Sequence, residues 1–475
     1  MSVCSIKALK KQRVNGIQLA RINLLVFTAM TKMTIIKNIL IKASATTLLV
    51  YGYIFFLMLA WLLLSLPVSQ KTDIDWIDTL FMAASTVSTT GLITVQPGSD
   101  YSLFGQIVIL LIIQIGGVGY MTFGSLILIS LKAKMSKDSL KSSLQVSKKE
   151  FAFPKEFKPS QFLKKIVLFT FSVELLGAIG LSIFFIQSGE PAPIWSAIFH
   201  SVNAFCTAGF SLMTTNFQSY QGDLGVNIII SILSLLGAIG FIVMIDIWGY
   251  LKDSKKSLHF TSKVILKVTF ALLIFGTLFI GFTDTVLLQL PANERWMIAF
   301  FQVMSASTTV GFNTYSVNEI HIASIFVLYL MMFIGASPTG TGGGLKTTSL
   351  AALIGIVRST LKLRKRISLN DKRLPLDKLQ LAATSFIFAS LVFFIAVLVL
   401  LLSEEAPLDW IVFEVLSALG TVGLSMGLTS ELSDFGKLFI VLLMFIGRIG
   451  VLTFGIFLSL NDSDSDDGEK EELIL

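Results

Sequence analysis

The sequence has few of the residues from which enzymes and metal sites are built. Among 475 residues there are two cysteines and three histidines, and charged residues make up 14%. Cys4 and Cys206 are too few for a disulfide framework and lack metal-ligand spacing. The chain contains no HExxH pattern, so a familiar membrane-enzyme site is hard to build. We therefore expect no enzyme and no tightly bound cofactor.

The scarcity of charge also excludes an ordinary soluble domain, in which about a quarter of the residues are charged. Hydrophobic residues make up 54% of this chain, and its mean hydropathy is +0.79. Such a chain buries most of its apolar surface in lipid. The sequence therefore predicts a multi-pass membrane protein, with membrane lipid rather than nucleic acid as its surroundings.

Eight apolar runs are long enough to cross a bilayer, which takes about 20 residues. Four precede a recurring short motif and four follow one; the runs are residues 44–66, 163–187, 264–290 and 381–402, then 102–131, 224–250, 321–357 and 434–460. Within each pair lies a half-apolar segment that is too short to span: Ile74–Ser88, Ile194–Cys206, Glu294–Thr308 and Leu408–Gly420. The pattern predicts an all-α fold of four repeats, each with a span, a re-entrant half-helix and a second span, in pseudo-fourfold arrangement around one pore.

A Thr-x-Gly motif follows each half-helix. The four strips are residues 89–92, 207–210, 309–312 and 421–424, and the glycine of each lies 13 to 15 residues after a tryptophan: Trp76, Trp195, Trp296 and Trp410. Tryptophan favours the membrane interface. One Thr-x-Gly could simply end a helix, because glycine is a common C-terminal cap. Four in the same place between paired spans instead predict four strips of backbone lining one axis.

Such strips suit a potassium ion. The negative C-terminal ends of four half-helices favour a cation, glycine lets carbonyl groups turn toward the axis, and carbonyl oxygens can replace the water around K⁺. We expect K⁺, as the transported substrate, to bind at the carbonyls of the x and glycine residues: Thr90, Gly91, Ala208, Gly209, Val310, Gly311, Val422 and Gly423.

The distribution of charge predicts the orientation. Residues 1–42, 131–165, 250–267 and 358–378 hold 31 of the 37 lysines and arginines, whereas the four motif-bearing segments hold 15 acids and three basic residues. Since basic loops stay in the cytoplasm, both termini face inward and the strips open outward. The outer acids either steer cations or only reflect topology. The basic N-terminus is either a cytoplasmic tail, with an interfacial helix near Ile22–Met33, or a targeting peptide.

This arrangement resembles the Trk/Ktr/HKT superfamily of potassium transporters over about residues 44–460. It is most similar to the Ktr branch and its KtrB-type membrane subunits, because it shows no extra pair of N-terminal spans. The resemblance implies a homodimer in the bacterial plasma membrane, a cytosolic nucleotide-binding ring of the KtrA type as regulatory partner, and sodium as an activator or co-transported ion.

Two further features match that superfamily. The apolar run 321–357 is about 55 Å long as a helix, nearly twice the membrane, and it contains Pro338 and five glycines within residues 335–348. It must break, either as a passive kink or, as the resemblance implies, as a gate below the filter. Arg448 lies at membrane depth in the last span, where a cation is functional by default. We expect the gate to contain Gly340, Thr341, Gly342, Gly343, Gly344, Lys346 and Arg448, although Lys346 by itself favours snorkelling to the cytoplasmic face.

The predicted boundaries follow from these features. They are a basic tail over residues 1–43, repeats over 44–131, 132–250, 251–357 and 358–460, and an acidic tail over 461–475. The sequence favours potassium uptake through a gated pore. A sodium-selective or non-selective cation pore, and a non-conducting membrane anchor for a cytosolic complex, stay open as alternatives. A nucleotide-binding P-loop is excluded, because GxxxxGK[ST] would need glycine where Leu345 stands.

Overall fold

The structure is a computed structural model that describes residues 45–117, 159–252, 257–338, 340–364, 366–370 and 372–459. Both predicted tails lie outside these residues, as do Thr339 and most of the basic segment 131–165. The described chain is almost entirely helical, and its two short strands, β1 (Ser368–Leu369) and β2 (Lys372–Arg373), form one antiparallel hairpin. The predicted helical fold class is confirmed.

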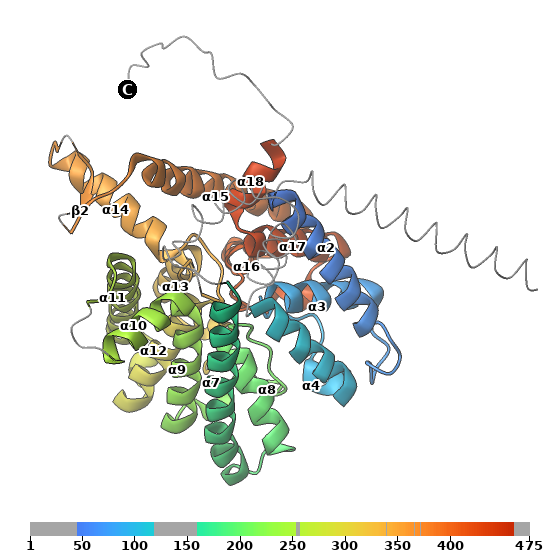
Figure 1. The fold of residues 1–475 in the computed structure, drawn as a ribbon. Helices are drawn as coiled ribbons and strands as arrows, with labels where there is room; N and C mark the ends of the chain where they lie inside the picture. Colours follow the sequence, from blue (N-terminus) through green and yellow to red (C-terminus); the bar gives the residue numbers. More distant parts are fainter. Residues whose placement is uncertain are drawn as a thin grey trace, which may run out of the picture.

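Four sets of helices follow one another around a common centre (Figure 1). Each set begins with a long helix on the outside: α2 (Ala45–Leu64), α7 (Pro159–Gln187), α11 (Phe260–Thr283) and α15 (Leu376–Ser403). A short helix then runs into the middle: α3 (Trp76–Ser88), α8 (Pro193–Phe205), α12 (Ala292–Thr308) and α16 (Leu408–Gly420). These short helices match the predicted half-helices to within two residues at each end. Three-residue and four-residue turns follow in the connections: α4 (Pro97–Asp100), η1 (Gln218–Tyr220), η2 (Leu287–Gln289), η3 (Val317–Glu319) and η4 (Leu428–Glu431).

The second long run is interrupted in repeats 2, 3 and 4. In repeat 1 an apolar helix covers Leu103–Gly117, and residues 118–158 lie outside the described residues. The other three sets each form two helices: α9 (Leu224–Ile239) with α10 (Phe241–Lys252), α13 (Ile322–Ile334) with α14 (Thr347–Leu361), and α17 (Asp434–Ile449) with α18 (Val451–Ser459). The break predicted in run 321–357 is therefore present.

The sequence did not predict the breaks in runs 224–250 and 434–460, which were expected to be continuous. In the structure α9 and α10 meet at 102°, and α17 and α18 meet at 96°. Each bend occurs at a single glycine with a positive φ angle, 92° at Gly240 and 94° at Gly450. Glycine adopts this backbone conformation without the steric cost that a Cβ would add.

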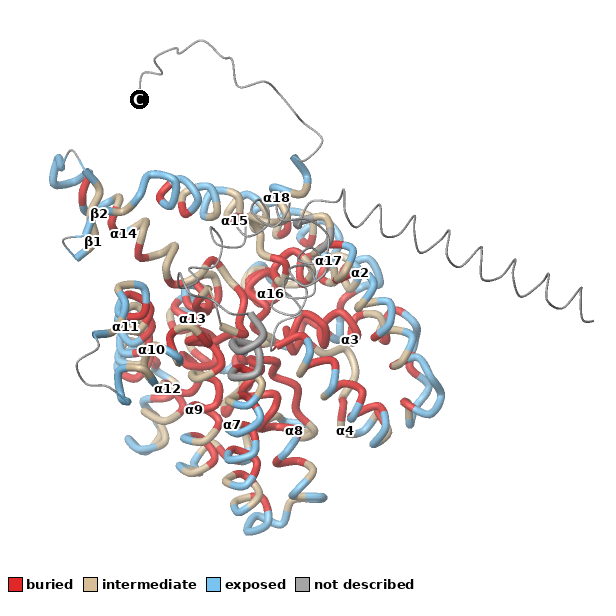
Figure 2. Tube along the Cα trace, in the orientation of Figure 1, coloured by how far each residue is buried: buried red, intermediate tan, exposed pale blue. Residues whose placement is uncertain are grey.

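Burial follows the distance from the centre (Figure 2). The four half-helices are buried over most of their length, whereas the outer helix α15 exposes large apolar side chains such as Ile387, Phe394 and Leu402. Within the described residues, α7, α11 and α15 are each long and apolar enough to cross a membrane, and the two bent pairs also qualify if each counts as one span. An apolar exterior around a buried centre is the pattern of a chain surrounded by lipid.

Candidate functional site: four backbone strips and a glycine loop

The four Thr-x-Gly strips have nearly the same backbone. In each strip the threonine has a positive φ between 48° and 60°, and the glycine has a positive φ between 68° and 92°. The x residue donates its N–H to the carbonyl of the residue five positions earlier: Thr90 to Ser85, Ala208 to Asn203, Val310 to Ser305 and Val422 to Ser417, at 2.8–3.1 Å. The same turn therefore ends each half-helix and starts each strip.

The four glycines close a ring, which we call the glycine ring (Gly91, Gly209, Gly311 and Gly423). A Cβ added to any one of them would lie closer than 3.0 Å to the x-residue carbonyl oxygen of the next repeat. The order runs from Gly91 to Ala208, Gly209 to Val310, Gly311 to Val422, and Gly423 back to Thr90. Four segments that are 102 to 118 residues apart in sequence thus meet around one axis, and only glycine fits where they meet.

Side chains of the half-helices hold these strips in place. Ser85 Oγ accepts the N–H of Gly91 at 3.1 Å, and Ser417 Oγ accepts that of Gly423 at 3.0 Å. In repeat 2, Asn203 Oδ1 accepts the N–H of Phe210 at 3.2 Å. The sequence analysis did not identify these residues as part of the site. A signal was present, because a serine or asparagine stands six residues before each of the four glycines.

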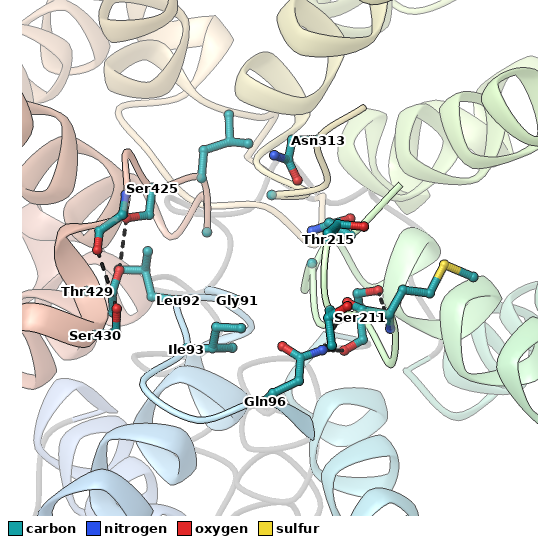
Figure 3. A pocket seen from close by; sticks show the side chains of 18 of the residues that line it. Gly91, Leu92, Ile93, Gln96, Ser211, Thr215, Asn313, Ser425, Thr429 and Ser430 are labelled. Carbon is teal, nitrogen blue, oxygen red and sulfur yellow. Dashed lines mark hydrogen bonds between the residues drawn. The ribbon is translucent and has the colours of Figure 1, made fainter. Parts of the chain in front are cut away.

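A cavity of about 290 Å³ lies over one side of the glycine ring, and we call it the vestibule (Figure 3). All four strips contribute to its wall, which carries hydroxyl and amide groups from residues such as Gln96, Ser211, Asn313, Ser425 and Thr429. None of the described residues that line the vestibule is charged. The wall itself can therefore solvate a cation but does not concentrate it, and any steering would come from acids farther out.

The glycine loop (residues 335–346, of which Thr339 is not described) lies on the other side of the ring, between α13 and α14. Thr207 Oγ1 donates to Thr341 Oγ1 at 2.9 Å, and Thr309 Oγ1 accepts the N–H of Gly343 at 3.2 Å. A Cβ on Gly343 would collide with Thr421 Oγ1. The loop therefore packs directly under the threonines of three strips.

The end of α9 also binds this loop. Ser337 donates its N–H to Ala238 O at 3.2 Å, and Thr341 donates its N–H to Gly237 O at 3.1 Å. The chain turns away after Ile239, so these carbonyls at the end of α9 are available to the loop. The bend at Gly240 and the glycine loop consequently fit each other.

Two predicted cations contact the glycine loop. Lys346 Nζ donates to Gly342 O at 2.8 Å, so the side chain turns into the loop and does not extend to the cytoplasmic face as the sequence favoured. Arg448 Nη1 donates to Thr341 O at 2.7 Å, and its Nη2 donates to Gly116 O in repeat 1. Arg448 thereby links the loop of repeat 3 to repeat 1 from its own place in repeat 4.

Other buried polar side chains of the core also form hydrogen bonds within the protein. His200 Nδ1 is bonded to Ser196 O at 2.7 Å, and Asn203 Nδ2 donates to Phe199 O at 2.8 Å. Glu174 in α7 accepts a hydrogen bond from Gln114 Nε2 at 3.0 Å. Within the described residues, no group of three or more His, Cys, Asp or Glu side chains is arranged to hold a metal ion.

Comparison with known proteins gives a consistent result. A family model described as "TrkH: Cation transport protein" matches residues 25–466. The chain is 35% identical to the Ktr system potassium uptake protein B of Bacillus subtilis, covering 89% of this chain and 95% of that protein. It is 32% identical to the potassium/sodium uptake protein NtpJ of Enterococcus hirae, covering 93% of this chain and 100% of that protein. The relatives are named as transporters and uptake proteins rather than enzymes.

The fold also has a solved counterpart. The crystal structure of the potassium transporter TrkH from Vibrio parahaemolyticus superposes with a TM-score of 0.65 at 19% sequence identity, covering 88% of this chain and 86% of that one. At this identity the likeness establishes the fold alone. Together with the apolar helices, it establishes a multi-pass membrane protein built from four span, half-helix, span repeats.

Proposed function

Because the chain belongs to the TrkH family of cation transport proteins, we propose that it takes up potassium through a gated pore whose selectivity filter is the glycine ring. The observation that carries the proposal is the closed contact between each filter glycine and the x-residue carbonyl of the next repeat. Eight backbone groups, those of Thr90, Gly91, Ala208, Gly209, Val310, Gly311, Val422 and Gly423, would provide the oxygen ligands.

The chemistry of the ring suits a weakly hydrated monovalent cation. Four buried half-helices end at the ring, and each directs the negative end of its dipole toward it. Backbone oxygens can replace the water molecules of such an ion as it passes. The vestibule, with neutral hydroxyl and amide groups, would receive the ion with part of its hydration shell.

The glycine loop with Lys346 and Arg448 would act as the gate. Gly340, Thr341, Gly342, Gly343 and Gly344 form a backbone segment held under the filter threonines by single hydrogen bonds. Lys346 and Arg448 place two cationic groups against its carbonyls. A backbone loop flanked by positive charge can block cations in one position and release them in another.

The proposed direction is inward across the bacterial plasma membrane, with both termini in the cytoplasm. The chain has no ATPase motif, and an inside-negative potential of 100 mV contributes about 2.3 kcal/mol per monovalent cation, enough for roughly fiftyfold accumulation. The relative named as a potassium/sodium uptake protein supports sodium as activator or co-ion, and the name "Ktr system" supports a multi-subunit system. We further propose that the regulatory partner is a KtrA-like cytosolic nucleotide-binding ring and that the chain forms a homodimer.

The decisive experiment is growth of a potassium-uptake-deficient bacterium at low potassium. Wild-type chain should rescue growth, and Gly311→Ser should abolish the rescue while the protein still reaches the membrane. The added side chain would collide with the Val422 carbonyl oxygen, and the φ angle of 81° at residue 311 is strained for any residue with a Cβ. Failure to rescue growth, together with uptake of sodium by the same cells, would favour a sodium pore. Rescue that is indifferent to Gly311→Ser would favour a membrane anchor that does not conduct.

A further inference from the structure

One register of the half-helices carries polar side chains that the filter and the gate do not use. The residue nine positions before the filter glycine is His200 in repeat 2, Gln302 in repeat 3 and Glu414 in repeat 4. All three side chains are fully buried. In repeat 1 the same position is Met82, which has no strong hydrogen-bonding group. A buried polar side chain requires a partner, so each of the three partners is informative.

His200 binds the segment that leaves the filter of repeat 2. Its Nδ1 lies 2.7 Å from the carbonyl oxygen of Ser196, which can only accept, so Nδ1 carries the hydrogen. In the neutral ring Nε2 is then the acceptor. Nε2 lies 2.9 Å from Ser211 Oγ and 3.4 Å from the backbone nitrogen of Leu212. Ser211 stands two residues after Gly209 and lines the vestibule.

Gln302 does the same in repeat 3. Its Nε2 donates to the carbonyl oxygen of Tyr315 at 2.6 Å. The same carbonyl accepts a hydrogen bond from Asn313 Nδ2 at 3.3 Å. Asn313 lines the vestibule two residues after Gly311, so the bond from the half-helix reaches the wall of the cavity through one shared oxygen.

Glu414 holds repeat 4 with two bonds. Ser425 Oγ donates to Glu414 Oε2 at 2.8 Å, and Thr429 Oγ1 donates to Glu414 Oε1. Thr429 Oγ1 also lies 3.1 Å from Ser425 Oγ, a contact that Figure 3 marks with a dashed line. Both hydroxyl residues line the vestibule, and Ser425 again stands two residues after the glycine. A carboxylate only accepts, so it fixes the orientation of both hydroxyl hydrogens.

Repeat 1 is secured differently. It has Met82 at this register, and its own outgoing segment instead reaches across to repeat 2. Gln96 Nε2 donates to Ser211 O at 3.1 Å and to Met213 O at 2.9 Å. In repeats 2, 3 and 4 the segment that follows the filter glycine is thus hydrogen-bonded to its own half-helix. In repeat 1 that segment is hydrogen-bonded to repeat 2 instead.

We propose that His200, Gln302 and Glu414 are positioning residues that set ion selectivity, because they fix the vestibule side of three filter strips to the buried half-helices behind them. The turn at the x residue fixes each strip from one side, and in repeats 1, 2 and 4 a half-helix side chain also accepts a backbone N–H of the strip. In repeats 2, 3 and 4, His200, Gln302 and Glu414 fix the strip from the vestibule side, through the segment that follows the glycine. With both sides held, the glycine carbonyls cannot move apart or together to suit ions of different size, and a preorganised ring discriminates better than a loose one.

The test rests on the proposed function and uses the full-length protein in proteoliposomes, with uptake of K⁺ and Na⁺ measured at matched protein levels. Glu414→Met installs the residue that repeat 1 has at this register. We expect the K⁺/Na⁺ uptake ratio to fall on the order of tenfold, as two bonds to a charged group are lost. Glu414→Gln, which can still bond both hydroxyls, should keep the ratio within about twofold. Met82→Leu is the matched control and should leave it unchanged.

Each outcome decides something. An unchanged ratio in Glu414→Met overturns the proposal, and so does a Glu414→Gln variant as unselective as Glu414→Met, because charge rather than positioning would then be responsible. If Glu414→Met does not reach the membrane, the double variant Ser425→Ala with Thr429→Val removes the same bonds from the other end, and it must lower the ratio by a similar factor. A wild-type protein that transports no potassium would instead refute the proposed function.

Discussion

The filter level and the loop level of this molecule are built on different plans. At the filter the four repeats share one turn, one hydrogen bond from the x residue, and one glycine with positive φ. At the loop level the second helices diverge: α9 and α17 bend at single glycines, whereas a loop containing Pro338 separates α13 from α14. The four repeats thus have the same backbone at the filter and different second helices below it.

The difference agrees with the roles that we propose for the two levels. An ion held on an axis by backbone oxygens requires equivalent ligands from every side, so variation between strips would unbalance the ring. Closing a pore requires only one element that occupies two positions. The glycine loop is a single element, and it contacts threonines of repeats 2 and 3 and an arginine of repeat 4. We therefore expect substitutions of the ring glycines to lower potassium uptake in every repeat. Substitutions that release the glycine loop should raise potassium flux.

The largest effect should come from the glycine ring itself. Gly91→Ala and Gly423→Ala each place a Cβ against a carbonyl oxygen of the neighbouring strip at a strained backbone angle. We expect uptake of potassium to fall on the order of a hundredfold or more in both, because strain and collision act together. Gly222→Ala, at an open position, should transport normally. Normal uptake by either ring variant would break the equivalence of the four strips.

Removal of the gate contacts should act in the opposite sense. Arg448→Ala removes the bonds to Thr341 O and Gly116 O, and deletion of residues 339–343 removes the loop segment that carries Gly340, Thr341, Gly342 and Gly343. Either change should raise potassium flux in proteoliposomes by up to about tenfold, since charge-assisted hydrogen bonds no longer hold the closed position. Arg358→Ala, on the exposed side of α14, should leave flux as it is. Unchanged or lower flux in folded protein would mean that the loop is a passive kink.

A smaller effect should distinguish repeat 4 from repeat 3 at the clamp position, which is the residue six positions before the ring glycine. Ser417 Oγ accepts the N–H of Gly423, whereas Ser305 Oγ at the same register has no hydrogen-bond partner among the described residues. Ser417→Ala should therefore raise the potassium concentration that gives half-maximal uptake about threefold to tenfold, because a buried N–H loses its acceptor. Ser305→Ala should change it less than about twofold. Equal effects in concentration-dependent uptake would show that the clamp is irrelevant to ion binding.

The smallest effect concerns the seam between repeats 4 and 1. Lys437 Nζ lies 2.7 Å from Asp78 Oδ1, which joins the start of α17 to α3, and both side chains are mostly buried. Lys437→Met should lower the free energy of unfolding by about 1 kcal/mol or less, with a smaller loss at high salt. Thermal unfolding in detergent measures this, with Lys362→Met at an exposed position as control. Destabilisation that does not depend on salt would point to packing rather than charge.

Much of the fold could be predicted because its signals are local. Apolar runs give the spans, and the half-helices were placed to within two residues. The four glycines and the break around Pro338 are also local, because they reflect which backbone angles a residue permits. The bends at Gly240 and Gly450 were missed for the converse reason. A lone glycine inside an apolar run allows a turn without requiring one, and only the packing of α10 and α18 makes the chain take it.

The contacts of the site were less predictable. Lys346 was expected at the cytoplasmic face, since a lysine at the end of an apolar segment usually reaches water, yet its ammonium group binds Gly342 O. The register of His200, Gln302 and Glu414 is visible once the four glycines are aligned. Nothing in the sequence, however, says that their partners lie 11 to 15 residues onward, on the far side of the strip.

The sequence by itself determined that the chain crosses a membrane, that it repeats one unit four times, and that each unit carries a glycine where the backbone must turn. Hydrophobicity and backbone freedom are properties of residues and their near neighbours, so a linear chain reveals them. Tertiary structure alone decided that the four turns close into a ring, that Arg448 joins the glycine loop to repeat 1, and that buried side chains hold three strips from behind. Those contacts join residues up to 333 positions apart, and their geometry exists only once the helices have packed.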